Sequence, residues 1–337
     1  MKTLEGVITC VPTVFNDEQE LDIEGFKENI TYLEEVGMHG IIATHSLGEF
    51  YALDEKEFNK VASAARDASK RMLCIIGCAY QNVREIVRRA NYADDIGADA
   101  VLIYPAHYML GRCSDDDMYE VMRMVNDATH QIQLVQYDYP PEMKRGTQTA
   151  VGPDLIGRML DFDRFKGFVT SVLRPHEGLR EVSETCRRYK NKISILSVTE
   201  PGLQLIMSFG GKGCLAPYGL AMPKLLISFY EACKEDPMKS LELYHRITKF
   251  PFENELPGML FPGKASKLFP GQVQILLSNW EVADRQATWL WPGNVKTFKA
   301  VIEAASRKAG PPRMPYGPPS PALRDFAKNW LADLGVL

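Results

Sequence analysis

Residues 41–50 read Ile-Ile-Ala-Thr-His-Ser-Leu-Gly-Glu-Phe, and this stretch joins a buried strand to a polar loop. The apolar, β-branched start after Gly40 is typical of a strand covered on both faces. Polar groups at the carboxyl end of such a strand are where parallel α/β proteins place chemistry. His45, Ser46 and Glu49 are able to transfer protons, although a loop in which Ser46 merely caps the next helix fits these residues equally well.

Strand and helix candidates alternate from residue 6 to about residue 234. Each apolar strand candidate is followed by an amphipathic helix candidate, at roughly 30 residues a pair. The expected strands are Gly6–Phe15, Gly40–His45, Met72–Ala79, Ala100–Pro105, Ile132–Asp138, Phe165–Ser171, Ile193–Val198 and Gly213–Tyr218. Eight such units that close on themselves form an α/β fold, the TIM (β/α)8 barrel. A doubly wound open sheet is the alternative, but no strand is followed by Gly-x-Gly-x-x-Gly.

The strand signal stops near residue 235, so we expect the barrel over residues 1–235 and a helical extension over residues 236–337. The Pro-rich segment 310–321 is predicted to be an extended linker because proline interrupts helices and sheets. The added helices are expected at Met238–Lys249, around Val273–Trp280, at Val295–Lys308 and at Ala322–Leu334.

Composition excludes several classes of protein. A formal net charge of −4 gives no electrostatic reason to expect a nucleic-acid or anionic-membrane partner. The 7 cysteines are scattered and odd in number, which favours reduced thiols in a cytoplasmic protein. No signal peptide or apolar run of membrane-spanning length is evident. No metal-binding or nucleotide-binding spacing occurs, so we expect a small-molecule substrate without a metal or cofactor.

Several strand ends together resemble the dihydrodipicolinate synthase and N-acetylneuraminate lyase family of aldolases, over roughly residues 4–305. The opening strand at 6–15, Ser-Leu-Gly-Glu at 46–49, Tyr-Asp-Tyr-Pro at 137–140 and 213–216 match family motifs in order. The tail at 309–316 is similar to the branch that contains trans-o-hydroxybenzylidenepyruvate hydratase-aldolase.

The resemblance implies a lysine on the sixth strand that forms a Schiff base with pyruvate, but this chain has Val169 at that position. An iminium withdraws electrons from the substrate, and valine cannot form one. Lys166 lies three residues earlier and is expected to point away from the barrel interior because strand side chains alternate. A different lysine in this role remains the alternative.

The resemblance assigns roles to the residues that remain. Tyr137 matches a tyrosine that relays protons, and Ser46 matches the hydroxyl that couples this tyrosine to substrate or solvent. Leu47 replaces a threonine, so the backbone N–H groups of residue 47 and Gly48 are left to bind a carboxylate. Glu49 matches a glutamate that holds the loop.

Other candidates lie on neighbouring strand ends. His45 stands where the family has a small residue. Its imidazole is equally consistent with a general base and with a ring that only fills space. His107 and Tyr108 lie on the loop where family members carry an aromatic residue that enters a neighbouring subunit's site. Ser171 and Leu215, on the sixth and eighth strand ends, complete the expected set of substrate-binding residues, whose other members are Leu47, Gly48, Glu49, Tyr108 and Val169.

Three functions therefore remain open. The first is a lyase-like enzyme that acts on a 2-oxo acid or related carbonyl compound by acid–base chemistry without an imine. The second is a pyruvate-dependent aldolase or lyase with a lysine elsewhere, and the third is a non-catalytic small-molecule-binding protein. The resemblance also implies a homotetramer built as a dimer of dimers.

Overall fold

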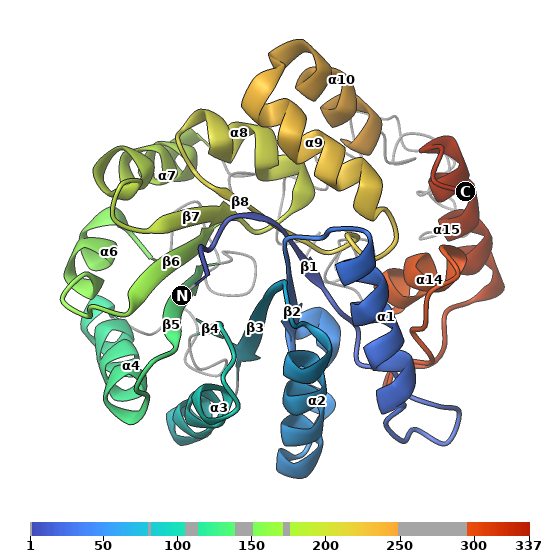
Figure 1. Cartoon of the computed structure of the whole chain (residues 1–337), viewed down its shortest axis with the longest axis horizontal. Coiled ribbons are helices and arrows are strands. Elements are labelled where there is room, and N and C mark those ends of the chain that lie inside the picture. Colours follow the sequence, from blue (N-terminus) through green and yellow to red (C-terminus); the bar gives the residue numbers. More distant parts are fainter. Residues whose placement is uncertain (1, 80–81, 105–113, 139–150, 171–175, 249–294) are drawn as a thin grey trace, which may run out of the picture.

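The eight predicted strands form a closed parallel barrel (Figure 1). The computed structural model describes residues 2–79, 82–104, 114–138, 151–170, 176–248 and 295–337. The strands are β1 Gly6–Cys10, β2 Gly40–Ala43, β3 Leu73–Cys78, β4 Ala100–Ile103, β5 Gln133–Asp138, β6 Phe165–Thr170, β7 Ser194–Ser197 and β8 Gly213–Ala216. Each strand pairs with the next, and β8 closes the ring on β1. The TIM-barrel prediction is confirmed.

The helices that follow the strands form a ring outside the barrel (Figure 1). They are α1 Ile23–Glu35, α2 Glu55–Ala68, α3 Val83–Asp95, α4 Asp115–Ala128, α6 Pro153–Met159, α7 His176–Tyr189, α8 Leu203–Ser208 and α9 Pro223–Glu235. Polar side chains fix where two of them begin: Asp54 and Ser114 each form a reciprocal capping box with the third residue of the helix. These boxes satisfy N–H groups that the helix itself cannot. None of the helices in the described ranges is long and apolar enough to cross a membrane.

Pairing register shows which side chains point into the barrel. Tyr137 of β5 pairs with Val169 of β6, which pairs with Leu196 of β7, so the three share one side of the sheet. The ring of His45, which follows β2, lies 5.9 Å from the ring of Tyr137. Because β2 and β5 are not neighbours, these side chains meet only across the interior. The row that contains Tyr137 and Val169 therefore faces inward.

The C-terminal helices α10 Pro237–Thr248, α14 Val295–Ala304 and α15 Pro321–Asp333 extend the barrel. Phe298 and Trp330 belong to the same hydrophobic cluster as the barrel strands. α14 lies beside α1 (Figure 1). The side-chain amide of Asn29 in α1 donates to the carbonyl of Lys308 at 2.6 Å, which ties the chain after α14 to this helix. A domain boundary at residue 235 stays a proposal, and the helix expected around residues 273–280 lies outside the described residues.

The segment expected to be a linker ends earlier and packs more closely than its sequence indicated. Pro321 is the first residue of α15, where a missing N–H costs nothing. Gly310 adopts a left-handed φ of 65°, and a Cβ there would lie 1.9 Å from the carbonyl oxygen of Phe15. Only glycine fits so near another backbone. The segment is therefore fixed against the start of the chain.

Candidate active site

Tyr137 and Val169 lie side by side at the carboxyl end of the barrel, paired across β5 and β6. Each is 1% exposed. Gly167 fits a crowded position on this side of β6, because a Cβ there would lie 3.0 Å from the side chains of Leu4 and Val135. Lys166 precedes it on the opposite side of the strand and is partly exposed. The side chain that β6 places next to Tyr137 is thus the hydrocarbon of Val169.

Three rings from separate strand ends, those of His45, Tyr104 and Tyr137, meet at this end of the barrel. Tyr104, which follows β4, lies with its ring centroid 4.2 Å from that of Tyr137 at an interplanar angle of 33°. The His45 ring lies edge-on to both, at 5.8 and 5.9 Å. Sequence reasoning missed Tyr104; the signal was an aromatic residue directly after an apolar strand and before Pro105. These three rings, which we call the aromatic wall, line the carboxyl end of the barrel.

The loop after β2 is organised around the Nδ1 atom of His45. The N–H of Leu47 donates to Nδ1 at 3.4 Å, and the hydroxyl of Ser46 lies 3.1 Å from it. The thiol of Cys10, at the end of β1, lies 3.9 Å away. Burial lowers the pKa of His45 to about 3, so the imidazole is neutral at physiological pH. The sequence therefore brings His45, Ser46 and Tyr137 to one end of the barrel, as expected.

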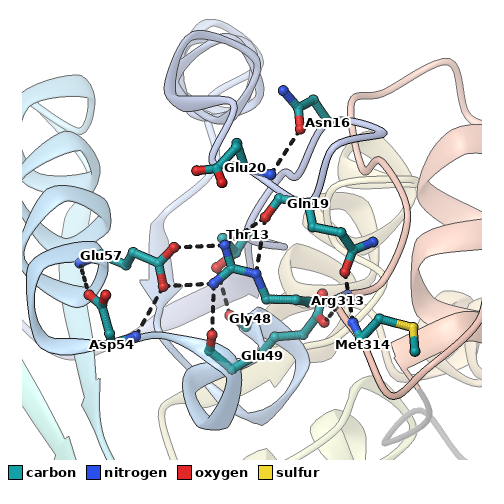
Figure 2. A network of polar contacts seen from close by, with 11 residues as sticks. Thr13, Asn16, Gln19, Glu20, Gly48, Glu49, Asp54, Glu57, Arg313 and Met314 are labelled. Atoms are coloured by element: carbon teal, nitrogen blue, oxygen red, sulfur yellow. Dashed lines mark hydrogen bonds and ion pairs between the residues drawn. The ribbon is translucent and has the colours of Figure 1, made fainter.

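Glu49 is held by the C-terminal extension (Figure 2). Its Oε1 lies 2.6 Å from Nζ of Lys299 in α14, and both side chains are fully buried. Its Oε2 accepts the N–H of Arg313 at 2.8 Å. Burial raises the pKa of the Glu49 carboxyl and lowers that of the Lys299 amine, while their mutual attraction opposes both shifts. Both carboxylate oxygens have protein partners, and a substrate contact through Glu49 stays a prediction.

Arg313 joins the loop to the turn before α1 and to α2 (Figure 2). Its guanidinium pairs with both oxygens of Glu57, at 2.6 and 2.7 Å, and donates to the carbonyl of Gln19. The hydroxyl of Thr13 donates to the carbonyl of Gly48 at 2.6 Å, which secures the other side of the loop. Residues far apart in sequence thus hold the 46–49 loop in place.

Glu200 is an acidic residue that sequence reasoning missed. It follows β7 at the carboxyl end of the barrel, is 2% exposed, and accepts the N–H of Tyr218 at 2.6 Å. Burial raises its pKa to about 7. After burial itself, the charge of Glu200 is the next cause that raises the pKa of the Cys10 thiol. A carboxyl that titrates near neutral pH at this edge is able to act as acid or base.

Glu200 should make stability depend on pH. Its folded-state pKa of about 7 exceeds the ordinary value of 4.5, so the stabilisation is full below pH 4.5 and is lost as pH rises through 7. We expect the free energy of unfolding to fall by roughly 3 kcal/mol over this range from this group alone. Urea unfolding of wild type and Glu200→Gln at several pH values measures the difference, since glutamine does not titrate. Parallel profiles for the two proteins would contradict the assignment.

The remaining predicted residues are distributed as follows. Leu47 and Leu215 are buried, and Leu215 pairs with the inward-facing Ile8. His107, Tyr108 and Ser171 lie outside the described residues. No group of three His, Cys, Asp or Glu side chains in the described part of the chain is arranged to hold a metal ion.

Comparison with known proteins identifies the family. The model of the dihydrodipicolinate synthetase family matches residues 3–256. The chain belongs to this family. As a lyase-like member of the dihydrodipicolinate synthetase family, it is 28% identical over 228 residues to a 4-hydroxy-tetrahydrodipicolinate synthase of Anaplasma marginale, covering 67% of this chain and 72% of that protein.

Two further similarities agree with this family. An uncharacterised DapA-like lyase of Thermococcus onnurineus is 24% identical over 242 residues, covering 72% of this chain and 80% of the other. Among solved structures, YagE of E. coli K12, a prophage protein of the dihydrodipicolinic acid synthase family in complex with pyruvate, matches with a TM-score of 0.79 and 18% identity. That match covers 100% of both chains and supports the fold of this family member.

Proposed function

We propose that this family member is a lyase-like enzyme that acts on a 2-oxo acid or related carbonyl compound by acid–base chemistry without a covalent imine. The observation that carries the proposal is the hydrocarbon side chain of Val169 beside Tyr137 at the carboxyl end of the barrel. An amine is needed to form an iminium, and the sixth strand does not present one there.

Acid–base roles fall to groups at the carboxyl end of the barrel. Tyr137 transfers the proton at the reacting carbon or oxygen, and Ser46 connects it to solvent. His45 is neutral because burial lowers its pKa to about 3, and Glu200, with a pKa of about 7, is a second proton-transfer group. The N–H of Leu47 is already bound to His45, so the N–H of Gly48 is the one proposed to contact substrate.

The missing iminium limits which reactions this site performs well. An iminium stabilises a carbanion equivalent, and its loss costs many kcal/mol in a carbon–carbon cleavage. Hydration, isomerisation and proton exchange need less carbanion stabilisation and are therefore favoured. Proton exchange into pyruvate in D2O, followed by NMR, tests the proposal: wild type should exchange the methyl protons. A total lack of exchange over a panel of 2-oxo acids would leave a binding protein as the better account.

Introducing a lysine on β6 should restore imine chemistry. We expect Val169→Lys to be trapped by borohydride with pyruvate as a reduced adduct, because a buried amine has a lowered pKa and attacks carbonyls. Intact-protein mass spectrometry measures the adduct, and Val169→Met is the control of similar bulk. Wild type should not be trapped; an adduct on any wild-type lysine would favour the pyruvate-dependent aldolase instead. Lys299 is a poor candidate for that role, since its Nζ is bound to Glu49 and to the carbonyl of Pro311 at 2.9 Å.

We also propose that the protein is a cytoplasmic homotetramer, built as a dimer of dimers. The proposal rests on the family resemblance, and reduced buried thiols such as Cys10 and Cys74 are consistent with the compartment. In this arrangement His107 or Tyr108 reaches the site of a neighbouring subunit. Light scattering coupled to size exclusion tests the assembly.

A further inference from the structure

The Nε2 atom of His45 is a buried polar group without a hydrogen-bond partner among the described residues. The side chain is 5% exposed and lies at the carboxyl end of the barrel, beside the rings of Tyr104 and Tyr137. A buried donor or acceptor that is left unpaired costs about 1–3 kcal/mol, so such groups in native proteins usually serve a ligand or water.

The contacts of the other ring nitrogen determine which form the imidazole takes. The N–H of Leu47 points to Nδ1 and is only able to donate, so Nδ1 must be an acceptor. The hydroxyl of Ser46 and the thiol of Cys10 approach the same atom. A neutral imidazole whose Nδ1 accepts carries its proton on Nε2. The unpartnered atom is therefore an N–H donor.

We propose that the Nε2–H of His45 is a fixed hydrogen-bond donor for an oxygen of the substrate that gains negative charge, the carbonyl oxygen of a 2-oxo acid. This inference rests on the proposed function and changes the expected role of His45, which is neither a general base nor a space-filling ring. The donor replaces part of the electron withdrawal that an iminium supplies in an aldolase.

The chemistry of proton exchange shows what the donor does. When the C–H bond next to the carbonyl breaks, its electron pair forms the carbon–carbon double bond of an enolate. The carbonyl π electrons move onto oxygen, and the proton leaves to solvent through the relay assigned to Tyr137 and Ser46. A donor already aimed at that oxygen stabilises the charge as it develops. Because the imidazole is neutral, it polarises the carbonyl without giving up its own proton, as neutral imidazoles do in other barrel enzymes.

A matched control exists at the other end of the same strand. His39 precedes β2, and its Nδ1 accepts the N–H of Val7 at 3.2 Å, as the Nδ1 of His45 accepts that of Leu47. Its ring lies 4.9 Å from that of Tyr230, at the amino end of the barrel. His39→Phe therefore removes a comparable imidazole far from the proposed substrate.

Two measurements test the donor. Long-range 1H–15N NMR of the histidine rings in wild type should show that His45 is protonated on Nε2 and not on Nδ1. The chemical shift of the Nε2–H proton should change when oxalate is added. Oxalate is the probe because it is a planar analogue of the pyruvate enolate. Titration calorimetry should show oxalate binding about 10- to 100-fold weaker in His45→Phe, the range for a hydrogen bond to a charged group. His45→Gln, which keeps an amide donor, should lose much less, and His39→Phe should bind like wild type.

The outcomes are separate from those of the exchange assay. A proton on Nδ1, an absence of oxalate binding, or equal binding by wild type and His45→Phe would overturn the inference. If His45→Phe does not fold, the inference is tested by the NMR tautomer of wild type and by the oxalate affinity of His45→Gln. Oxalate bound through His45 in a protein that exchanges no 2-oxo acid protons would instead reject the proposed function and leave the donor standing.

Discussion

Tyr137→Phe is expected to slow proton exchange of pyruvate by about 10²- to 10⁴-fold, the usual contribution of a positioned acid–base group. The phenol is 1% exposed and its ring is fixed by Tyr104 and by pairing with Val169, so the substitution removes one oxygen and little packing. Exchange rates in D2O under saturating pyruvate measure the effect. Thermal unfolding of the variant should show that the barrel is intact.

Tyr104→Phe is the matched control for this prediction. The two rings stack at 4.2 Å at the same end of the barrel, and both side chains are 1% exposed. We assign no proton transfer to Tyr104, so its variant should keep most of the exchange activity. Equal losses in both variants would mean that the wall acts as packing, and that Tyr137 has no special chemical role.

Lys299→Met is expected to lower the free energy of unfolding by about 3–5 kcal/mol, because it leaves the Glu49 carboxylate buried without its counter-charge. Nζ of Lys299 lies 2.6 Å from Oε1 of Glu49 and both side chains are fully buried, so water cannot take the place of the amine. Urea unfolding at neutral pH measures the loss. The carbonyl of Pro311 also loses its donor, which adds to the effect.

The double variant Glu49→Leu/Lys299→Met separates the burial of a lone charge from loss of the pair. Replacing both partners by apolar groups is often nearly neutral, so most of the lost stability should return. Lys234→Met is the surface control, since Lys234 and Glu231 form an exposed pair at 3.1 Å that should matter little. A double variant no more stable than Lys299→Met would show that the pair does not act as a unit.

The sequence alone determined the barrel and most of its element positions. Apolar strands, helices with one apolar face and their regular alternation are local patterns. Strands two to eight were each predicted within a few residues of the observed strand. The end of the first strand was placed too far along: residues 11–15 are buried, but the strand ends at Cys10. A run of apolar residues does not show where pairing stops, because burial against a helix or loop has the same pattern.

The sequence also located several groups of the candidate site. His45, Ser46 and Tyr137 stand at strand ends, and in a parallel barrel all such ends share one face. The family resemblance placed Val169 at the lysine position of the sixth strand, and the pairing of β5 with β6 sets Val169 beside Tyr137. Strand periodicity fixes where these residues lie and which way they face, whereas their roles in a site stay predictions.

Only the tertiary structure decided what surrounds these groups. Lys299 and Arg313 lie more than 200 residues from Glu49 along the chain, and no local pattern links them to it. The burial that raises the pKa of Glu200 and lowers that of His45 comes from several strands at once. The His45 ring contacts two groups of its own loop, in Ser46 and Leu47, but the Cys10 thiol reaches it only because β1 pairs with β2. Local spacing determines which residues reach the barrel mouth, whereas long-range packing determines their charge and hydrogen-bonding state.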